Sequence, residues 1–154
     1  MKPLYYGAYG SNLNRKQMLE RCPASQPLEA SLLEGYMLVF REVADIKSNP
    51  GSSVPIGIYT ITRACEKALD RYEGFPRLYR KEYFEMDLKT VSESVMIYTM
   101  NEGYGFGEPP RGYVEIIDEG YRDWGFDQAS LHEGIKFSIK NADGTSYRSG
   151  KWSG

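Results

Sequence analysis

The segment from Leu4 to Leu19 constrains the fold more than any other part of the sequence. A short apolar run, Leu4–Ala8, predicts a β-strand, and Asn14–Leu19 predicts the first turns of a helix. Between them lies Tyr9-Gly10-Ser11-Asn12-Leu13, a turn with a glycine inside it. Because glycine has no Cβ, the backbone there can approach a ligand closely. The N–H groups at the start of the following helix carry a partial positive charge toward the turn. The segment therefore predicts an anion or oxyanion site, to which Ser11 and Asn12 add hydrogen-bonding side chains.

A plainer interpretation of the same segment is a capped helix start. Asn14 would be the N-cap residue, and Gln17, three positions later, would complete a capping box. The segment alone does not separate this interpretation from the binding site.

Length and charge exclude several classes of protein. A chain of 154 residues is one domain with a sizeable core. The net charge is −2 and the basic residues are scattered, so neither nucleic acid nor an anionic membrane is an expected partner. No stretch approaches the ~20 apolar residues of a membrane span. Lys2 is not followed by an apolar signal core, so we expect a cytoplasmic protein.

The residues that most often bind metals or attack substrates are scarce. The two cysteines, Cys22 and Cys65, are too few for a disulfide scaffold, and we expect both to pack in the core. His132 is the only histidine, so neither a histidine-based metal site nor a Ser-His-Asp triad is supported. We expect no metal and no cofactor.

Hydrophobic patterns and turn residues predict alternating strands and helices, and thus an α+β fold with about six strands. Glu34-Gly35 is predicted to turn a hairpin, and the stretch 48–52 is predicted to form a loop. The stretch 141–154 is predicted to form a polar tail that is loose at its end. The predicted strands lie at 28–33, 36–40, 54–61, 79–88 and 94–100, and the predicted helices at 14–21 and 62–72 and from Pro110 and Asp127 onward.

Glu73 is the candidate catalytic residue. It falls at the last turn of the predicted helix 62–72, and Gly74 follows it as a C-terminal cap. The negative end of the helix and partial burial would both raise the pKa of this carboxyl group. Such a group can accept and donate a proton near neutral pH. Helix position alone favours the alternative, a solvated glutamate at a helix end.

Two separated motifs, Tyr9–Leu13 and Glu73-Gly74, together resemble the gamma-glutamylcyclotransferase family, in its AIG2-like and gamma-glutamylamine cyclotransferase-like branch. The strand 53–59 and the pair Pro109-Pro110, which opens a tyrosine-bearing helix, occur in the same order as in that family. The resemblance runs from about Leu4 to about Ile139. It implies a small mixed β-barrel flanked by helices, with a single domain over residues 1–140 and a polar C-terminal tail over 141–154.

The resemblance also implies an activity. The α-amino group of a γ-glutamyl amide would attack its own γ-carbonyl and release 5-oxoproline plus an amine or amino acid, without a cofactor. Glu73 would be the general acid and base, and the turn Tyr9–Leu13 would bind the substrate's anionic groups. Tyr79 and Tyr113 match tyrosines that line the family's pocket, although core packing explains both equally well.

Two alternatives stay open at this point. One is a related amide-cleaving enzyme that acts on a γ-glutamyl-protected intermediate, and the other is a non-catalytic small-molecule binding protein with the same pocket. Arg111-Gly112 and the tail depart from the family's pattern, so the resemblance leaves the leaving group of the substrate undefined. The sequence does not address the oligomeric state.

Overall fold

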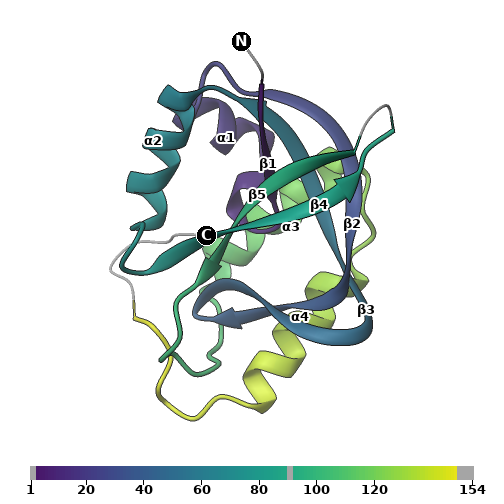
Figure 1. Ribbon diagram of the computed structural model, residues 1–154. Coiled ribbons are helices and arrows are strands. Elements are labelled where there is room, and N and C mark those ends of the chain that lie inside the picture. Colours follow the sequence, from purple (N-terminus) through teal and green to yellow (C-terminus); the bar gives the residue numbers. More distant parts are fainter. Residues whose placement is uncertain (1–2, 90–91, 149–154) are drawn as a thin grey trace.

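The computed structural model describes residues 3–89 and 92–148, and in these ranges one curved sheet is surrounded by helices (Figure 1). The strand order is β2-β3-β1-β5-β4; β1 and β5 are parallel, and the other neighbouring pairs are antiparallel. The strands are β1 (Leu4–Ala8), β2 (Gln26–Arg41), β3 (Val43–Ile61), β4 (Tyr79–Asp87) and β5 (Ser92–Met100). The helices are a 3-10 turn (Ser11–Leu13), α1 (Arg15–Arg21), α2 (Arg63–Glu73), α3 (Arg111–Trp124) and α4 (Ala129–Lys140).

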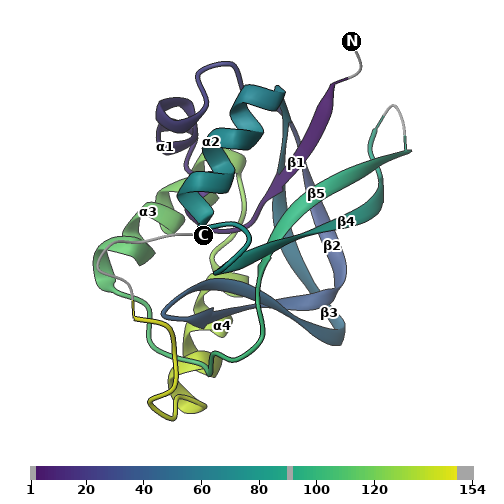
Figure 2. The same cartoon turned by 60° about the vertical axis from the view of Figure 1, so that its left-hand side comes forward.

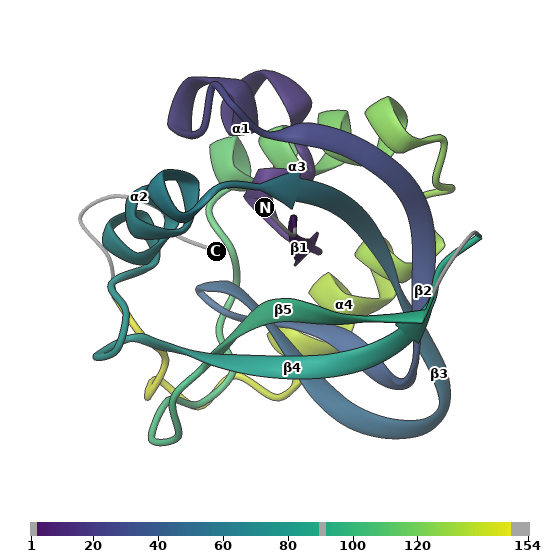
Figure 3. The ribbon, with the colours of Figure 1, turned by 45° about the horizontal axis from the view of Figure 1, so that its top comes forward.

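The predicted α+β class is confirmed, with two corrections to the sheet. The described residues form five strands rather than about six, and β2 and β4 are the edges of an open sheet rather than neighbours in a closed barrel. Figure 3 shows how strongly this sheet curves: β1 lies near the middle, β2 and β3 lie on one side, and α2 lies on the other.

The strand count differs because Glu34-Gly35 does not turn the chain. The predicted strands 28–33 and 36–40 are parts of the single strand β2, in which Gly35 (φ 84°) forms a bulge. The predicted loop 48–52 lies inside β3 and bulges opposite Gly35, since Ser48 pairs with Tyr36 and Ser53 pairs with Glu34. Long-range pairing along both strands therefore overrides the local turn signals.

The predicted helix caps are largely confirmed. The Asn14 side chain accepts a hydrogen bond from the Gln17 N–H (3.1 Å), and the Thr62 hydroxyl accepts one from the Cys65 N–H (3.1 Å). Gly74 ends α2 in the left-handed conformation, at φ 67°. Asp127 accepts a hydrogen bond from the Ala129 N–H (2.8 Å), although the residue next to α4 is Gln128 and not Asp127.

Close packing under the first turn joins α3 to the sheet. Leu13 is fully buried, and its carbonyl accepts a hydrogen bond from the Trp124 indole N–H (2.7 Å). Gly57 on β3 makes room for both side chains, because a Cβ at this position would lie 2.6 Å from the Trp124 ring and 2.9 Å from Leu13. This contact fixes the turn between β1 and α1 against the core.

The described part of the C-terminal tail, residues 141–148, packs against the connection between β5 and α3, and the end of the tail, which the sequence predicts to be loose, lies outside the described residues. The Gly105 N–H donates to the Thr145 carbonyl (3.1 Å), and the Tyr104 and Tyr147 rings meet edge to face at 5.5 Å. Figure 2 shows this yellow segment running back beside that connection. Among the described residues, none of the helices has the length and apolarity needed to cross a membrane.

Candidate active site

Helix α2 carries Glu73 into the interior. Its buried residues are Cys65, Leu69 and Glu73, which repeat every four positions and so lie on one helix face. Glu73 is the last residue of this face, and its side chain is only 1% exposed. The alternative of a solvated helix-end glutamate is therefore wrong. The predicted rise in the pKa of its carboxyl group stays a prediction.

Six tyrosines within the described residues lie near enough to Glu73 for its charge to affect the pKa of their phenols. Burial is the main cause that raises the pKa of each of these phenols, and the nearby charge of Glu73 raises it further. Phenols with raised pKa values stay protonated at neutral pH, so these side chains remain neutral in the neighbourhood of the carboxylate. The tyrosines in this group are Tyr6, Tyr9, Tyr72, Tyr79, Tyr98 and Tyr113.

The two tyrosines predicted to line the pocket, Tyr79 and Tyr113, are brought together at Ala44. Both side chains are fully buried. The Tyr79 hydroxyl donates to the Ala44 carbonyl (2.6 Å), and the Ala44 N–H donates to the Tyr113 hydroxyl (2.9 Å). Both residues thus belong to the core and lie near Glu73, so packing and a place in the site are compatible.

The side chains of the turn reach the same group of tyrosines. The Tyr9 hydroxyl donates to the Tyr98 carbonyl (2.7 Å), and Ser11 Oγ lies 3.1 Å from the Tyr72 hydroxyl. The Asn12 amide donates to the Tyr6 hydroxyl (2.9 Å). The structure therefore brings Tyr9, Ser11 and Asn12 together with the residues around Glu73.

The backbone of the turn is partly occupied by its own hydrogen bonds. The Leu13 N–H donates to the Gly10 carbonyl (3.0 Å), and the Asn12 carbonyl accepts from the Tyr59 hydroxyl (2.8 Å). Leu13 itself lies against Trp124 in the core and is not brought to Glu73 by any contact described here. An anion at this turn would therefore be bound by N–H groups that precede Leu13.

Arg21 is a residue of this site that the sequence analysis did not identify. Its guanidinium donates to the Asn12 side-chain carbonyl (2.7 Å) and lies 3.7 Å from the centre of the Tyr72 ring. The same charge lowers the pKa values of Tyr6 and Tyr72, against the larger opposing effect of burial. Arg21 lies four residues after Gln17 and donates to its side chain (2.9 Å), but this spacing indicates only a helix pair and did not mark Arg21 as a site residue.

A second buried carboxylate, Asp45, lies near Tyr9 and Tyr79, and its charge adds to the rise in the pKa values of both phenols. Asp45 is 4% exposed, and burial raises its pKa above the ordinary value of 3.8. Arg41 (2.8 Å) and the Met100 N–H (3.0 Å) donate to the two carboxylate oxygens and oppose this rise. The charges of Glu73 and Asp45 thus both act on the phenols of Tyr9 and Tyr79.

The donor set does not suit a metal ion. Around Glu73 the polar groups are phenols, a hydroxyl and an amide, and within residues 3–89 and 92–148 no three His, Cys, Asp or Glu side chains are grouped to hold a metal. The arrangement suits proton transfer at Glu73 beside neutral hydrogen-bond donors.

A curved sheet, a turn that leads into a helix, and a buried glutamate at the end of a central helix define a small α+β domain of the cyclotransferase type. The family model "Gamma-glutamyl cyclotransferase, AIG2-like" matches residues 6–124, and the chain belongs to this family. Family and fold together indicate a gamma-glutamyl cyclotransferase-like enzyme.

Solved structures share the fold at low sequence identity. The uncharacterized protein loc79017 from Homo sapiens and a structure described as "Gamma-glutamyl cyclotransferase" are each 22% identical, with TM-scores of 0.77 and 0.76; each alignment covers 97% of this chain and 95% of the other. YkqA from Bacillus subtilis is 18% identical (TM-score 0.75), and its alignment covers 94% of this chain and 57% of YkqA. No curated protein matches the sequence.

Proposed function

We propose that this protein converts a γ-glutamyl amide to 5-oxoproline and a free amine or amino acid, with Glu73 as the general acid and base. The observation that carries the proposal is the burial of Glu73 (1% exposed) among tyrosines that also contact the Tyr9–Asn12 turn. Membership of the family supports the reaction class. We place the reaction in the cytoplasm, where the two free thiols stay reduced.

The reaction is an intramolecular aminolysis. The substrate's α-amino nitrogen forms a bond to its γ-carbonyl carbon, and the bond between that carbon and the amide nitrogen breaks. Glu73 takes a proton from the attacking amine and gives a proton to the departing nitrogen, so protons balance without water or a cofactor. Folding the bound γ-glutamyl group toward the attack geometry supplies much of the rate, because nucleophile and electrophile belong to one molecule.

The surroundings of Glu73 suit both of its roles. A carboxyl group that is shielded from water changes its protonation state readily when a charged substrate arrives. The phenols of Tyr79 and Tyr113 have raised pKa values and stay neutral, so they do not compete for the proton. The Asn12 N–H and the other donors at the start of the turn would stabilise the oxyanion or hold the substrate's α-carboxylate.

The first experiment is the detection of 5-oxoproline by mass spectrometry. Wild-type protein and Glu73→Gln would each be incubated with γ-glutamyl amino acids, γ-glutamyl amines and ε-(γ-glutamyl)lysine. We expect 5-oxoproline from wild type with at least one substrate and a loss of about a hundredfold or more in the variant. Glu115→Gln, an exposed carboxylate on α3, is the matched control and should retain wild-type turnover.

Two further measurements distinguish cyclisation from hydrolysis. A substrate whose α-amino group is acetylated has no nucleophile and should give no product. In 18O-labelled water, cyclisation leaves 5-oxoproline unlabelled, whereas hydrolysis places 18O in the γ-carboxylate of glutamate. Labelled glutamate would replace the proposal with an amidase, and 5-oxoproline formed equally by Glu73→Gln would remove Glu73 from its role.

A further inference from the structure

A second site lies where β1 begins, apart from the residues around Glu73. It is a cavity of about 220 Å³ between the first half of α2 and the strands β1, β4 and β5. We propose that this cavity binds a small organic cation, specifically a primary alkylammonium group with an apolar body. The inference concerns binding alone and does not depend on the proposed cyclotransferase activity.

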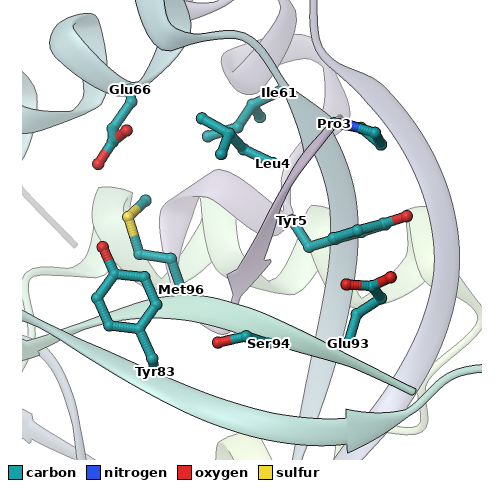
Figure 4. A pocket seen from close by; sticks show the side chains of 9 residues that line it. All are labelled: Pro3, Leu4, Tyr5, Ile61, Glu66, Tyr83, Glu93, Ser94 and Met96. Carbon is teal, nitrogen blue, oxygen red and sulfur yellow. The ribbon is translucent and has the colours of Figure 1, made fainter. Parts of the chain in front are cut away.

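The walls of the cavity are mainly apolar and aromatic. Leu4 and Met96 line it together with the rings of Tyr5 and Tyr83. Tyr83 is 62% exposed, so its ring is accessible to a ligand from solvent. Figure 4 shows Tyr83 and Tyr5 on opposite sides of the cavity. Aromatic faces on two sides attract a cation through their ring quadrupoles.

The charges at the cavity are negative. Glu66 and Glu93 line it, and none of the lysines and arginines that the structure describes does. Lys81, which pairs with Glu66 (2.7 Å), also pairs with Asp70 (3.0 Å) and lies over the Phe75 ring. Glu93 is half-buried, and its carboxylate makes no hydrogen bond or ion pair with any side chain or backbone group that the structure describes. The Glu93 carboxylate is therefore the charged group of the cavity that is available to a ligand.

These features select the chemistry of the ligand. A neutral apolar ligand would cover the Glu93 carboxylate without pairing it, which costs free energy. An anion would be repelled by the same charge. An ammonium group satisfies the carboxylate with a charge-assisted hydrogen bond while its alkyl chain contacts Leu4 and Met96. The volume lies below the range of about 300–1,000 Å³ that is typical of drug-sized ligands, so a small amine fits.

A polar layer separates this cavity from Glu73. Asp70, one turn before Glu73 on α2, accepts hydrogen bonds from the Tyr98 hydroxyl (2.5 Å) and from Lys81 (3.1 Å). Neither Asp70 nor Tyr98 lines the cavity, whereas Glu66 lies two turns before Glu73 and does line it. Variants of Glu93 and Tyr83 therefore alter the cavity without touching the candidate active site.

The test is an NMR titration of 15N-labelled protein with n-butylammonium, 1-butanol and butyrate, which share a carbon chain and differ in charge. We expect n-butylammonium to shift the amide signals of the cavity-lining residues in a saturable way, with 1-butanol and butyrate at least about fivefold weaker. Glu93→Gln and Tyr83→Leu should each weaken butylammonium binding by roughly threefold or more.

Glu34→Gln is the matched control, because Glu34 is an exposed carboxylate on β2 that lies outside the cavity. It should bind butylammonium as wild type does. Equal binding of 1-butanol and butylammonium, unchanged binding by Glu93→Gln, shifts at other surfaces, or no shifts at all would each overturn the proposal. Because Glu93 and Tyr83 are not core residues, the amide spectra of the variants verify that each is folded.

Discussion

Tyr79 and Tyr113 hold the two backbone polar groups of a single residue: the Tyr79 hydroxyl donates to the Ala44 carbonyl and the Tyr113 hydroxyl accepts from the Ala44 N–H. One tyrosine comes from the sheet and the other from α3, so Ala44 joins β4 and α3 through β3. The charge of Glu73 reaches both phenols. Tyr79 and Tyr113, two tyrosines of the candidate site, therefore also connect β4 and α3 to β3.

Removing either hydroxyl should destabilise the protein. Tyr79→Phe takes a donor from the buried Ala44 carbonyl, and Tyr113→Phe takes the acceptor from its N–H. A buried polar group that loses its partner costs about 1–3 kcal/mol, so each variant should lower the free energy of unfolding in urea by that amount. Tyr83→Phe, at an exposed position, should change it by less than about 0.5 kcal/mol. An unchanged unfolding midpoint in both buried variants would contradict the hydrogen bonds at Ala44.

Local chemistry explains why the helix ends could be predicted from the sequence. Asn14 and Thr62 can accept hydrogen bonds from backbone groups two or three residues ahead, and Gly74 tolerates the left-handed conformation. These inferences needed only neighbours in sequence. Glu73 is different, because helix position alone favours a solvated glutamate and only the family resemblance made Glu73 the candidate catalytic residue.

The remaining features depend on contacts between distant residues. Glu34-Gly35 carries a turn signal, yet pairing along both sides of it keeps β2 continuous. The place of Arg21 beside Tyr72 arises from the packing of α1 against α2, which no local pattern encodes. The family resemblance supplied Tyr9, Tyr79 and Tyr113 among the tyrosines near Glu73. It did not supply Tyr6 and Tyr98, which alternate along strands as ordinary core residues do.

Arg21 should act as a positioning residue. Arg21→Met removes the hydrogen bond to Asn12 and the stacking on Tyr72, so the turn and the end of α2 lose a shared support. If the proposed function is correct, kcat/KM for the best γ-glutamyl substrate should fall by about tenfold or more, because small misplacements are costly in catalysis. Arg21→Lys should recover little, since an ammonium cannot both stack and donate as the planar guanidinium does.

The control for Arg21 is Arg15→Met on the same helix. Arg15 lies over the Trp124 ring, at 4.3 Å from its centre, and its side chain makes no described contact with Ser11 or Asn12. It should retain kcat/KM within about twofold. Equal losses in the two variants would indicate a general effect of surface charge rather than positioning of the turn.

The two thiols should be unreactive in the folded protein. Cys22 is 1% exposed, and burial, followed by the proximity of Cys65, raises the pKa of its thiol to about 12. Because the thiolate is the reactive form, Ellman's reagent should label the native protein slowly at pH 8. In urea both thiols should react at once, giving two per chain. Rapid labelling of the native protein would show that the contact between α1 and α2 opens readily.

Asp45 should make stability depend on pH in a defined direction. Burial raises the pKa of this carboxyl group in the folded state above its ordinary value of 3.8, so the folded protein binds the proton more tightly than the unfolded chain. The stabilising contribution of the neutral form is complete below that ordinary value and is lost as pH rises through the raised pKa. The difference in unfolding free energy between wild type and Asp45→Asn should therefore shift against wild type as the pH rises from about 4 toward neutral.

Urea unfolding of both proteins across this range measures the effect. Asparagine keeps an oxygen for the Met100 N–H and loses the charge that pairs with Arg41, so we also expect a difference in unfolding free energy that does not change with pH. The diagnostic quantity is the slope of the difference in unfolding free energy against pH. A slope of opposite sign would mean that Arg41 stabilises the ionised carboxylate more than burial disfavours it.

Gly120 tests whether the turn before α1 must lie directly on α3. A Cβ at Gly120 would lie 2.7 Å from the Asn14 nitrogen and 2.8 Å from the Leu13 carbonyl carbon, and these are backbone atoms that cannot move alone. Gly120→Ala should therefore push the turn away from α3, lower the free energy of unfolding by about 1–3 kcal/mol, and reduce any cyclotransferase activity along with it. Glu115→Ala, at an exposed position of the same helix, should be neutral or slightly stabilising, because alanine favours helices. If Gly120→Ala unfolded at the wild-type urea concentration, the close approach of α3 to Leu13 and Asn14 would not be what holds the turn in place.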